Sequence, residues 1–314
     1  WFAFGDETSA MHLASILLTF VFILIIIEKY TRGKSQYYHS SQKNRPIKPI
    51  MLKGKYKFFA FTWCLLICLL GFIIPLAQLL VWFVDTYSYM FESAYVDIII
   101  NTIFVAGLAS FIIVSISLYS CYINRSANNI FTNFSLKIFS LGYAIPGVVI
   151  AVGIIIPITM LDNIQAFLFG SPLYYLSGSL VALIIAYLVR FSTISYNATE
   201  AGLSKIKKNI DLTVKSFGLS NLNIIRKVHI PMMKTTITTS LILVFVDIVK
   251  ELPATLILRP FNFDTLAINI YELASSEQLS YIASPSLMLI IIGLIPVIIL
   301  IRKTISSGGQ NIEA

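Results

Sequence analysis

The sequence predicts an all-α polytopic membrane protein with about seven transmembrane helices. Hydrophobic residues make up 57% of the 314-residue chain and charged residues only 12%, about half the charged fraction of a soluble globular domain. The apolar residues lie in continuous runs of about 20 residues, the length that an α-helix needs to cross the hydrocarbon core. Only helices and closed barrels satisfy their backbone hydrogen bonds in lipid, and the short alternating segments of a barrel are absent from the sequence.

Seven apolar segments are expected to span the bilayer. They are residues 11–27, 58–84, 98–121, 138–160, 178–196, 236–256 and 285–302. The first stands apart from the other six, because a basic and proline-interrupted stretch separates them. The predicted organisation is therefore a lone helix in residues 1–27, a linker at 28–57, a six-helix domain at 58–305 and a tail at 306–314. Within that domain, residues 199–235 form a long inner loop.

The distribution of Lys and Arg over the loops predicts the orientation. Loops 28–57, 122–137 and 197–235 are basic, as is the start of the C-terminal tail, whereas the three loops between them contain a single basic residue, Arg259. Cytoplasmic loops carry the excess of positive charge in membrane proteins. We therefore expect the basic loops and the C-terminus in the cytoplasm. This topology accounts for the net charge of +8, so no nucleic-acid partner is needed to explain it.

The inner loop has a helix–turn–helix pattern. Apolar residues recur every three or four positions over 200–217, which predicts an amphipathic helix. Gly218 is placed to end this helix, and Ser220 to cap a second short helix at 221–229. Pro231 then suits the first turn of the next helix. An ordinary amphipathic loop that lies on lipid headgroups fits the same pattern.

This loop resembles the cytoplasmic loop of ABC importer permeases, which carries the pattern E-A-A-x(3)-G-x(9)-I-x-L-P. Gly218, Val228, Ile230 and Pro231 stand where G, I, L and P belong, while Leu-Thr-Val replaces the E-A-A triplet and Asp211 comes one residue before it. The resemblance implies that the loop is a coupling loop that docks on a cytoplasmic ATPase subunit. The coupling residues expected from it are Asp211, Lys215, Gly218, Ser220, Val228, Ile230 and Pro231.

A second stretch, VKELPATLILRPFNFDTLAINIYELASSEQ, at residues 249–278, resembles the ferric-iron subgroup of these permeases. So do GYAIPGVVIAVG at 142–153, GLIPVIIL at 293–300 and EKYTRGKSQYYH at 28–39. The resemblance covers nearly the whole sequence. It implies the type I permease fold, and it implies that these residues are the C-terminal half of a fused permease of about twelve spans, with the N-terminal half as a partner.

The same resemblance implies a bacterial inner-membrane machine with several components. A periplasmic binding protein would deliver ferric iron to the outer mouth, and a dimer of ABC ATPase subunits would use ATP in the cytoplasm. The chain itself would bind no cofactor and would not be an enzyme. The sequence agrees with this division of labour, because no P-loop motif G-x-x-x-x-G-K-[ST] occurs in it. Its three histidines are scattered and have no partner at the spacing of a known motif.

Charged residues occur at the outer end of the predicted span 236–256. Asp247, Lys250 and Glu251 are three and four positions apart, which predicts one helix face within mutual reach. Because unpaired charges at membrane depth are costly, these residues should pair or line water. They form either the wall or outer gate of a path, or an ion-pair cluster that fixes helix packing. The path and gate candidates are Asp247, Lys250, Glu251, Pro253, Arg259, Pro146 and Gly147.

Oxygen-bearing side chains near the outer side are candidates for brief contact with a metal cargo. Ferric ion is a hard cation that prefers carboxylates and phenolates, which Asp247, Glu251, Tyr271 and Glu272 offer. A permease that held its ion tightly would not release it, so we expect transient contacts and no permanent metal site. Downstream, Pro253 is expected to break the helix and Asp264 to cap a helix that runs to about residue 274.

Other functions fit parts of the sequence. The same importer architecture could carry thiamine or a small oxyanion, since the cargo follows from the resemblance alone. A proton- or sodium-driven secondary transporter would use Asp247, Lys250 and Glu251 as its ion relay. A non-transporting scaffold would leave those intramembrane charges without a role.

Overall fold

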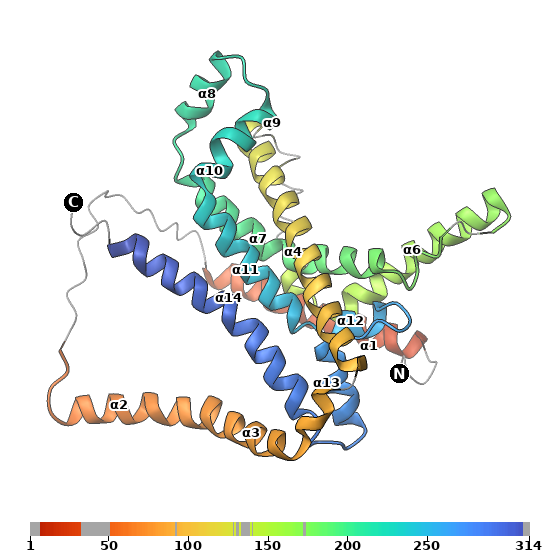
Figure 1. Ribbon diagram of the computed structural model, residues 1–314. Coiled ribbons are helices and arrows are strands. Elements are labelled where there is room, and N and C mark those ends of the chain that lie inside the picture. Colours follow the sequence, from red (N-terminus) through yellow and green to blue (C-terminus); the bar gives the residue numbers. More distant parts are fainter. Residues whose placement is uncertain are drawn as a thin grey trace.

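The computed structural model describes residues 7–32, 51–91, 93–127, 129, 132, 139, 141–171 and 174–309. The ordered elements of these residues are all helical, and they contain no strand (Figure 1). The predicted all-α polytopic fold is therefore confirmed.

The elements, in chain order, are α1 (Glu7–Arg32), α2 (Lys55–Cys68), η2 (Leu69–Ile73), α3 (Ile74–Thr86), η3 (Tyr87–Phe91), α4 (Ser93–Ala127), η4 (Gly142–Ala144), α6 (Gly147–Phe169), α7 (Leu180–Ser204), α8 (Lys208–Ser216), α9 (Asn221–Ile224), η5 (Ile225–His229), α10 (Ile230–Met232), α11 (Lys234–Val249), α12 (Pro253–Leu258), α13 (Leu266–Ser275) and α14 (Ala283–Gly309).

Five helices among the described residues are long and apolar enough to cross a membrane: Lys55–Phe91, Ala94–Ser126, Gly147–Phe169, Leu180–Ser204 and Ala283–Arg302. A sixth candidate combines α11 with the helical segment before it, from which α11 departs at 85°. Because of that sharp angle, only α11 runs alongside the neighbouring spans, and the preceding segment belongs to the inner loop. The lone first helix, α1, carries a shorter apolar stretch at Ser15–Leu24.

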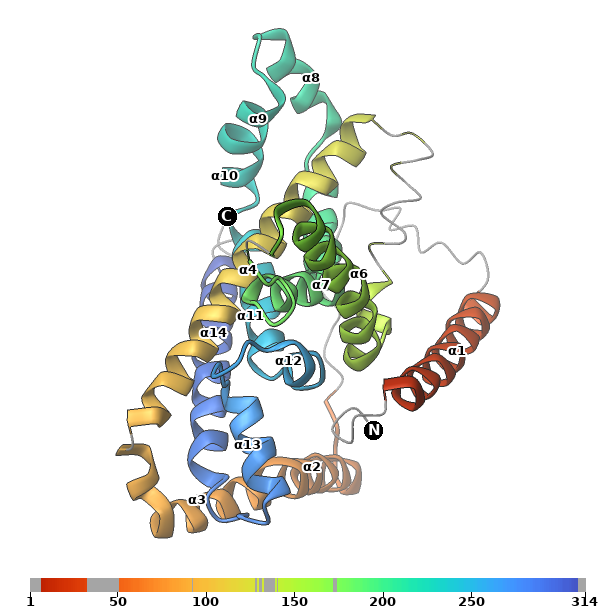
Figure 2. The same ribbon diagram turned by 90° about the vertical axis from the view of Figure 1, so that its right-hand side faces the viewer.

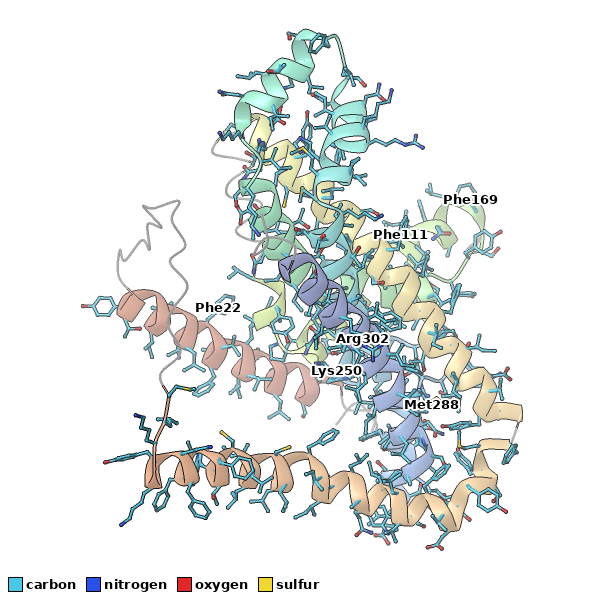
Figure 3. All side chains as sticks on the ribbon, turned by 60° about the vertical axis from the view of Figure 1, so that its left-hand side comes forward. Phe22, Phe111, Phe169, Lys250, Met288 and Arg302 are labelled. Atoms are coloured by element: carbon cyan, nitrogen blue, oxygen red, sulfur yellow. The ribbon has the colours of Figure 1, made fainter. Side chains whose placement is uncertain are left out.

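The core lies where α4, α7 and α11 pack against one another, and α6 and α12 cover one side of it (Figure 2). Alanines lie at these contacts, among them Ala106 and Ala109 of α4 and Ala182 and Ala186 of α7, all fully buried. Small residues allow helix backbones in a membrane to approach closely. The outer surfaces of the same helices are apolar, as Phe111 of α4 and Phe169 of α6 show (Figure 3).

The rest of the protein leaves the surface of helix α2 uncovered. No residue of α2 is buried, and the helix stands away from the bundle, while its continuation α3 packs on α14 (Figure 1). Phe58, Phe61 and Trp63 are among its exposed apolar side chains. In a membrane protein such a surface is covered by lipid or by another protein chain.

The span expected at 138–160 begins and ends later than predicted. Helix α6 starts at Gly147, with Pro146 at its N-cap, and continues to Phe169. Before it the chain makes the short turn η4, because Gly142 lies directly against α7: a Cβ there would be 1.8 Å from the carbonyl oxygen of Val189. The close approach requires glycine at this position.

The span expected at 236–256 is interrupted. Helix α11 ends at Val249, and a separate helix, α12, starts at Pro253. The proline has no N–H to donate to the carbonyl of Val249, so the α11 ladder cannot continue through it. The predicted effect of Pro253 is confirmed, but the break comes before this residue.

Several ends of the other segments also differ from expectation. Helix α1 continues to Arg32 and α14 to Gly309, while most of the predicted linker and the last five residues of the tail lie outside the described part. Thr265, and not Asp264, occupies the N-cap position of α13. The division into a lone helix, a linker, a six-helix domain and a tail stays a prediction.

Candidate functional site

The inner loop contains helices α8, α9 and α10 and projects beyond the ends of α7 and α11 (Figure 1, top). Its first half differs from the single helix predicted at 200–217: α7 runs on to Ser204, the chain turns, and α8 begins at Lys208. Gly218 ends the turn after α8 with a φ of 77°, which confirms the predicted stop. Ser220 holds the N-cap position of α9, although its side chain makes no capping hydrogen bond.

Arg125, at the inner end of α4, explains the break after α7. Its guanidinium donates to the carbonyl oxygens of Leu203 at 2.6 Å and Ile206 at 2.8 Å, two acceptors that a continuous helix would use internally. It also pairs with Asp211 of α8, Nε to Oδ2, at 2.6 Å. His229 of η5 approaches the other oxygen of Asp211, with Nε2 at 3.0 Å. We call Arg125, Asp211 and His229 the inner cluster.

The inner cluster joins segments that are far apart in the sequence, and two of its members were missed by sequence reasoning. Arg125 had been counted only as a topology signal, and His229 as a histidine without a partner. Asp211 is one of the predicted coupling residues, and its side chain is only 14% exposed. The available signal was Asp211 itself, one of two carboxylates, with Glu200, in the basic loop 197–235.

His229 is buried in this cluster, with 1% of its side chain exposed. Burial lowers the pKa of His229, Asp211 raises it, and Arg125 lowers it again, for a net shift below the ordinary value. Its ring packs against that of Tyr122 of α4, with centroids 5.5 Å apart. His229 is therefore a buried imidazole with a lowered pKa at the base of the inner loop.

The outer face of the inner loop is apolar and uncovered. Leu212, Phe217 and Leu222 are each more than 60% exposed, and Ile230 is also exposed. Ile225, three residues after Leu222, instead faces the core. A cluster of exposed apolar side chains on a basic loop marks a surface that contacts another protein or the membrane.

The remaining predicted coupling residues lie within the same loop. Lys215 donates to the hydroxyl of Ser126 in α4 at 3.3 Å. Val228 is half-buried, and Pro231 lies in the first turn of α10, as predicted.

The charged residues at the end of α11 do not share one helix face, which corrects the prediction. Asp247 and Lys250 pair at 2.7 Å, but α11 ends at Val249, so Glu251 turns away toward α7. There it lies 3.2 Å from the Nε of Arg190, and its Oε1 accepts a hydrogen bond from the backbone N–H of Ala254. Lys250 keeps 60% of its side chain exposed, whereas Glu251 keeps 6%.

Gly147 completes this second site, which we call the central cluster: Gly147, Arg190, Glu251 and Ala254. A Cβ on Gly147 would lie 2.7 Å from both Arg190 Nη1 and Glu251 Oε1 and 3.3 Å from the backbone nitrogen of Ala254. Arg190 Nη1 also donates to the carbonyl oxygen of Ile145, just before Pro146, at 3.3 Å. The start of α6 therefore lies in close contact with the ion pair that Arg190 of α7 makes with Glu251, the residue in the break between α11 and α12.

Sequence reasoning named Gly147, Pro146 and Glu251 as path candidates but treated them separately. It missed Arg190, although a lone arginine within the predicted span 178–196 was a readable signal. Thr255 extends the cluster, because its hydroxyl donates to the carbonyl oxygen of Glu251 at 2.8 Å and lies 2.6 Å from the hydroxyl of Tyr187.

The four metal-contact candidates do not converge. Asp247 pairs with Lys250, Glu251 with Arg190, and Glu272 with Arg259, which also pairs with Asp264. Tyr271 is exposed on α13. Among the described residues no three His, Cys, Asp or Glu side chains are placed to share a metal ion.

Comparison with known proteins assigns the family. The family model for "Binding-protein-dependent transport system inner membrane component" matches residues 112–303. The chain is 25% identical over 306 residues to the Fe(3+)-transport system permease protein FbpB 2 of Haemophilus influenzae, covering 95% of this chain and 57% of that protein. It is also 25% identical over 158 residues, 50% of this chain and 56% of the relative, to a Salmonella typhimurium protein named as a 2-aminoethylphosphonate transport system permease, PhnV.

A bacterial alginate ABC transporter, crystallised in complex with an alginate pentasaccharide-bound periplasmic protein, contains a chain with the same fold. The TM-score is 0.63 at 16% identity, and the match covers 78% of this chain and 92% of that chain. The present chain spans little more than half the length of the curated relatives it matches. The family match includes the inner loop, the central cluster and most of the bundle, and the chain thus belongs to the binding-protein-dependent transport system inner membrane components.

Proposed function

We propose that this chain is the membrane permease part of an ATP-driven importer, in which separate ATPase subunits bind and hydrolyse ATP on the cytoplasmic side. The observation that carries the proposal is the inner loop: its apolar outer face is exposed, while its base is fixed to the bundle by Arg125, Asp211 and His229. A surface that is uncovered outside and rigidly held inside can receive a partner and pass its movement on. The basic loops and the C-terminus face the cytoplasm in this arrangement.

Transport then follows from movement of the inner loop together with the helices to which it is fixed. When the ATPase dimer closes, it displaces the inner loop, and the attached helices α4 and α7 move with it. The start of α6 and the α11–α12 break meet at the central cluster, so a shift of α7 moves Arg190 away from Glu251. We assign the central cluster as a gate of the path, with the N-terminal half of the permease as the opposite wall.

The proposed cargo is ferric iron, which an external binding protein delivers to the outer mouth. The relative over 95% of the chain is named as an Fe(3+) permease. The oxygen side chains Asp247, Glu251, Tyr271 and Glu272 suit a hard cation. The three carboxylates each have a cationic partner already, which favours brief contacts over retention. A phosphonate is the second candidate cargo, because the PhnV relative aligns with half of the chain.

Uptake and ATP hydrolysis by the full-length parent chain test this function. The parent would be reconstituted with its co-purified ATPase and binding protein, and uptake of radioactive ferric iron and of 2-aminoethylphosphonate would be measured with and without ATP. We expect ATP-dependent iron uptake that survives dissipation of the membrane potential. Uptake that depends on the potential and not on ATP would instead establish an ion-coupled secondary transporter.

Gly218→Leu tests the inner loop in the same assay. We expect it to reduce uptake while leaving membrane insertion intact. Gly170→Leu is the matched control, because both glycines have a φ near 80° and open space around the Cβ position, so the backbone strain is alike, about 1–2 kcal/mol for a residue with a Cβ. Equal uptake by the Gly218→Leu variant and the control would show that the inner loop has no role in transport.

A further inference from the structure

The inner end of α4 binds the turn after α7, helix α8 and the start of α9. Arg125 holds α8 through Asp211 and the turn after α7 through two carbonyl oxygens. The hydroxyl of Tyr122 donates to the side-chain oxygen of Asn221, at the start of α9, at 3.0 Å. Ser126 accepts from Lys215. These contacts come from a single turn of one helix, so the inner loop and the end of α4 move together.

The outer part of the same helix binds the start of α13. The hydroxyl oxygen of Thr102 accepts a hydrogen bond from the backbone N–H of Leu266 at 2.9 Å, and the side-chain amide of Asn101 donates to the carbonyl oxygen of Asp264 at 3.4 Å. Thr102 is 1% exposed. Asp264 in turn pairs with Arg259, which also holds Glu272 of α13. The outer loop is therefore anchored on α4 as well.

Helix α4 is suited to connect these two ends. Thr102 and Arg125 lie on one α-helix, about 35 Å apart along its axis at 1.5 Å per residue. The helix contains no proline, in contrast to α6 and α14, each of which has an internal proline. An uninterrupted helix that is held at both ends carries a displacement as a rigid element.

We propose that α4 transmits movement between the inner loop and the outer loop, with Arg125 as the inner joint and Thr102 as the outer joint. The inference rests on the proposed function, since it assigns a route for ATPase-driven movement. Arg125 and Thr102 are both positioning residues, because they act through the loops that they hold. The consequence is that occupation of the outer mouth and hydrolysis of ATP are linked through one helix.

The chemistry of the inner joint requires arginine. A planar guanidinium reaches Asp211 and the carbonyl oxygens of Leu203 and Ile206 at the same time, whereas a lysine ammonium is a compact point charge. Arg125→Lys therefore keeps the positive charge opposite Asp211 and loses the simultaneous contacts. At the outer joint, Thr102→Val removes the acceptor for Leu266 at nearly constant volume, and Thr102→Ser restores it.

A double-mutant cycle on the full-length parent chain, reconstituted in lipid with its ATPase and binding protein, tests the proposal. The readout is the amount of radioactive ferric iron taken up per ATP hydrolysed. We expect Arg125→Lys and Thr102→Val each to lower this ratio about tenfold, within the range of known coupling between sites. The ratio of the double variant should be no lower than that of the worse single variant, because both substitutions break the same connection.

Controls separate this role from general stability. Arg302→Lys makes the same replacement at an exposed position of α14, and Ser110→Ala removes a buried hydroxyl whose hydrogen bond stays within α4. Both should keep the wild-type ratio, and so should Thr102→Ser. ATPase co-purification should be equal for all variants.

Four outcomes overturn the inference. If the two losses in the ratio multiply in the double variant, the two joints act independently. If the Arg125→Lys variant keeps the wild-type ratio, Arg125 only stabilises the loop. Loss of ATPase co-purification in the Arg125→Lys variant assigns Arg125 to the docking surface instead. If the wild-type parent neither retains an ATPase nor takes up cargo with ATP, the proposed function fails, and the inference with it.

Discussion

The inner and central clusters both pair an arginine with a carboxylate where helices end, but they are built differently. In the inner cluster, Arg125 makes a 2.6 Å hydrogen bond to Asp211 and two more to backbone carbonyl oxygens. In the central cluster, the Nε of Arg190 lies 3.2 Å from Glu251 without hydrogen-bond geometry, and Nη1 reaches a carbonyl oxygen only at 3.3 Å.

This difference indicates which site stays closed and which one opens. Short, charge-assisted hydrogen bonds at several points fix both the position and the orientation of a guanidinium. The Arg190–Glu251 ion pair is longer and makes fewer contacts, so less is lost when the helices around it shift. We therefore expect the inner cluster to persist through the transport cycle and the central cluster to rearrange.

The largest effect should come from Arg190→Leu. The substitution leaves Glu251 buried without its partner, which costs about 3 kcal/mol or more of stability. The double substitution Arg190→Leu with Glu251→Leu should recover most of the loss, because no buried charge remains. Thermal unfolding of the purified parent chain gives the comparison. A double variant as unstable as the single one would contradict the pairing.

A smaller but more specific effect is expected from Gly147→Ala. The new methyl group would lie 2.7 Å from both members of the ion pair, an overpacking that costs about 1–3 kcal/mol. Since the cost falls on the closed arrangement of the gate, we expect slower uptake per ATP hydrolysed. Gly153→Ala in the same helix is the matched control, because nothing lies within 4 Å of its Cβ position. Equal uptake by both variants would argue against a gate at this position.

The smallest effect concerns His229 and pH. Because its folded pKa lies below the ordinary value of about 6.5, an opened inner loop binds the proton more readily than the closed loop. The contribution of His229 to loop stability is therefore complete above about pH 6.5 and is lost as pH falls through that value toward the folded pKa. Amide hydrogen exchange of residues 205–233, corrected for intrinsic rates, should show reduced protection in acid. His229→Gln should flatten this pH dependence, and an unchanged profile would indicate another titrating group.

Local signals were read correctly from the sequence. Gly218 ends a helix, Ser220 holds an N-cap position, and Pro231 and Pro253 begin helices. Each of these depends on the backbone preferences of one residue and its immediate neighbours, which the sequence displays directly. The single helix at 200–217 was wrong because Arg125 of another helix takes up the carbonyl oxygens at the break after α7. The common face of Asp247, Lys250 and Glu251 was wrong because α11 ends at Val249, before Pro253.

The sequence by itself determined the membrane fold, because apolar runs of spanning length leave the backbone no alternative to a helix in lipid. The sequence also determined which residues are chemically unusual in a membrane span. They are Pro146 and Gly147 at a helix start, and Glu251 as a carboxylate at membrane depth. Only the tertiary structure decided their partners. Arg125 reaches Asp211 across 86 positions and Arg190 reaches Glu251 across a helix break, and contacts of this kind depend on how helices pack, which no local spacing records.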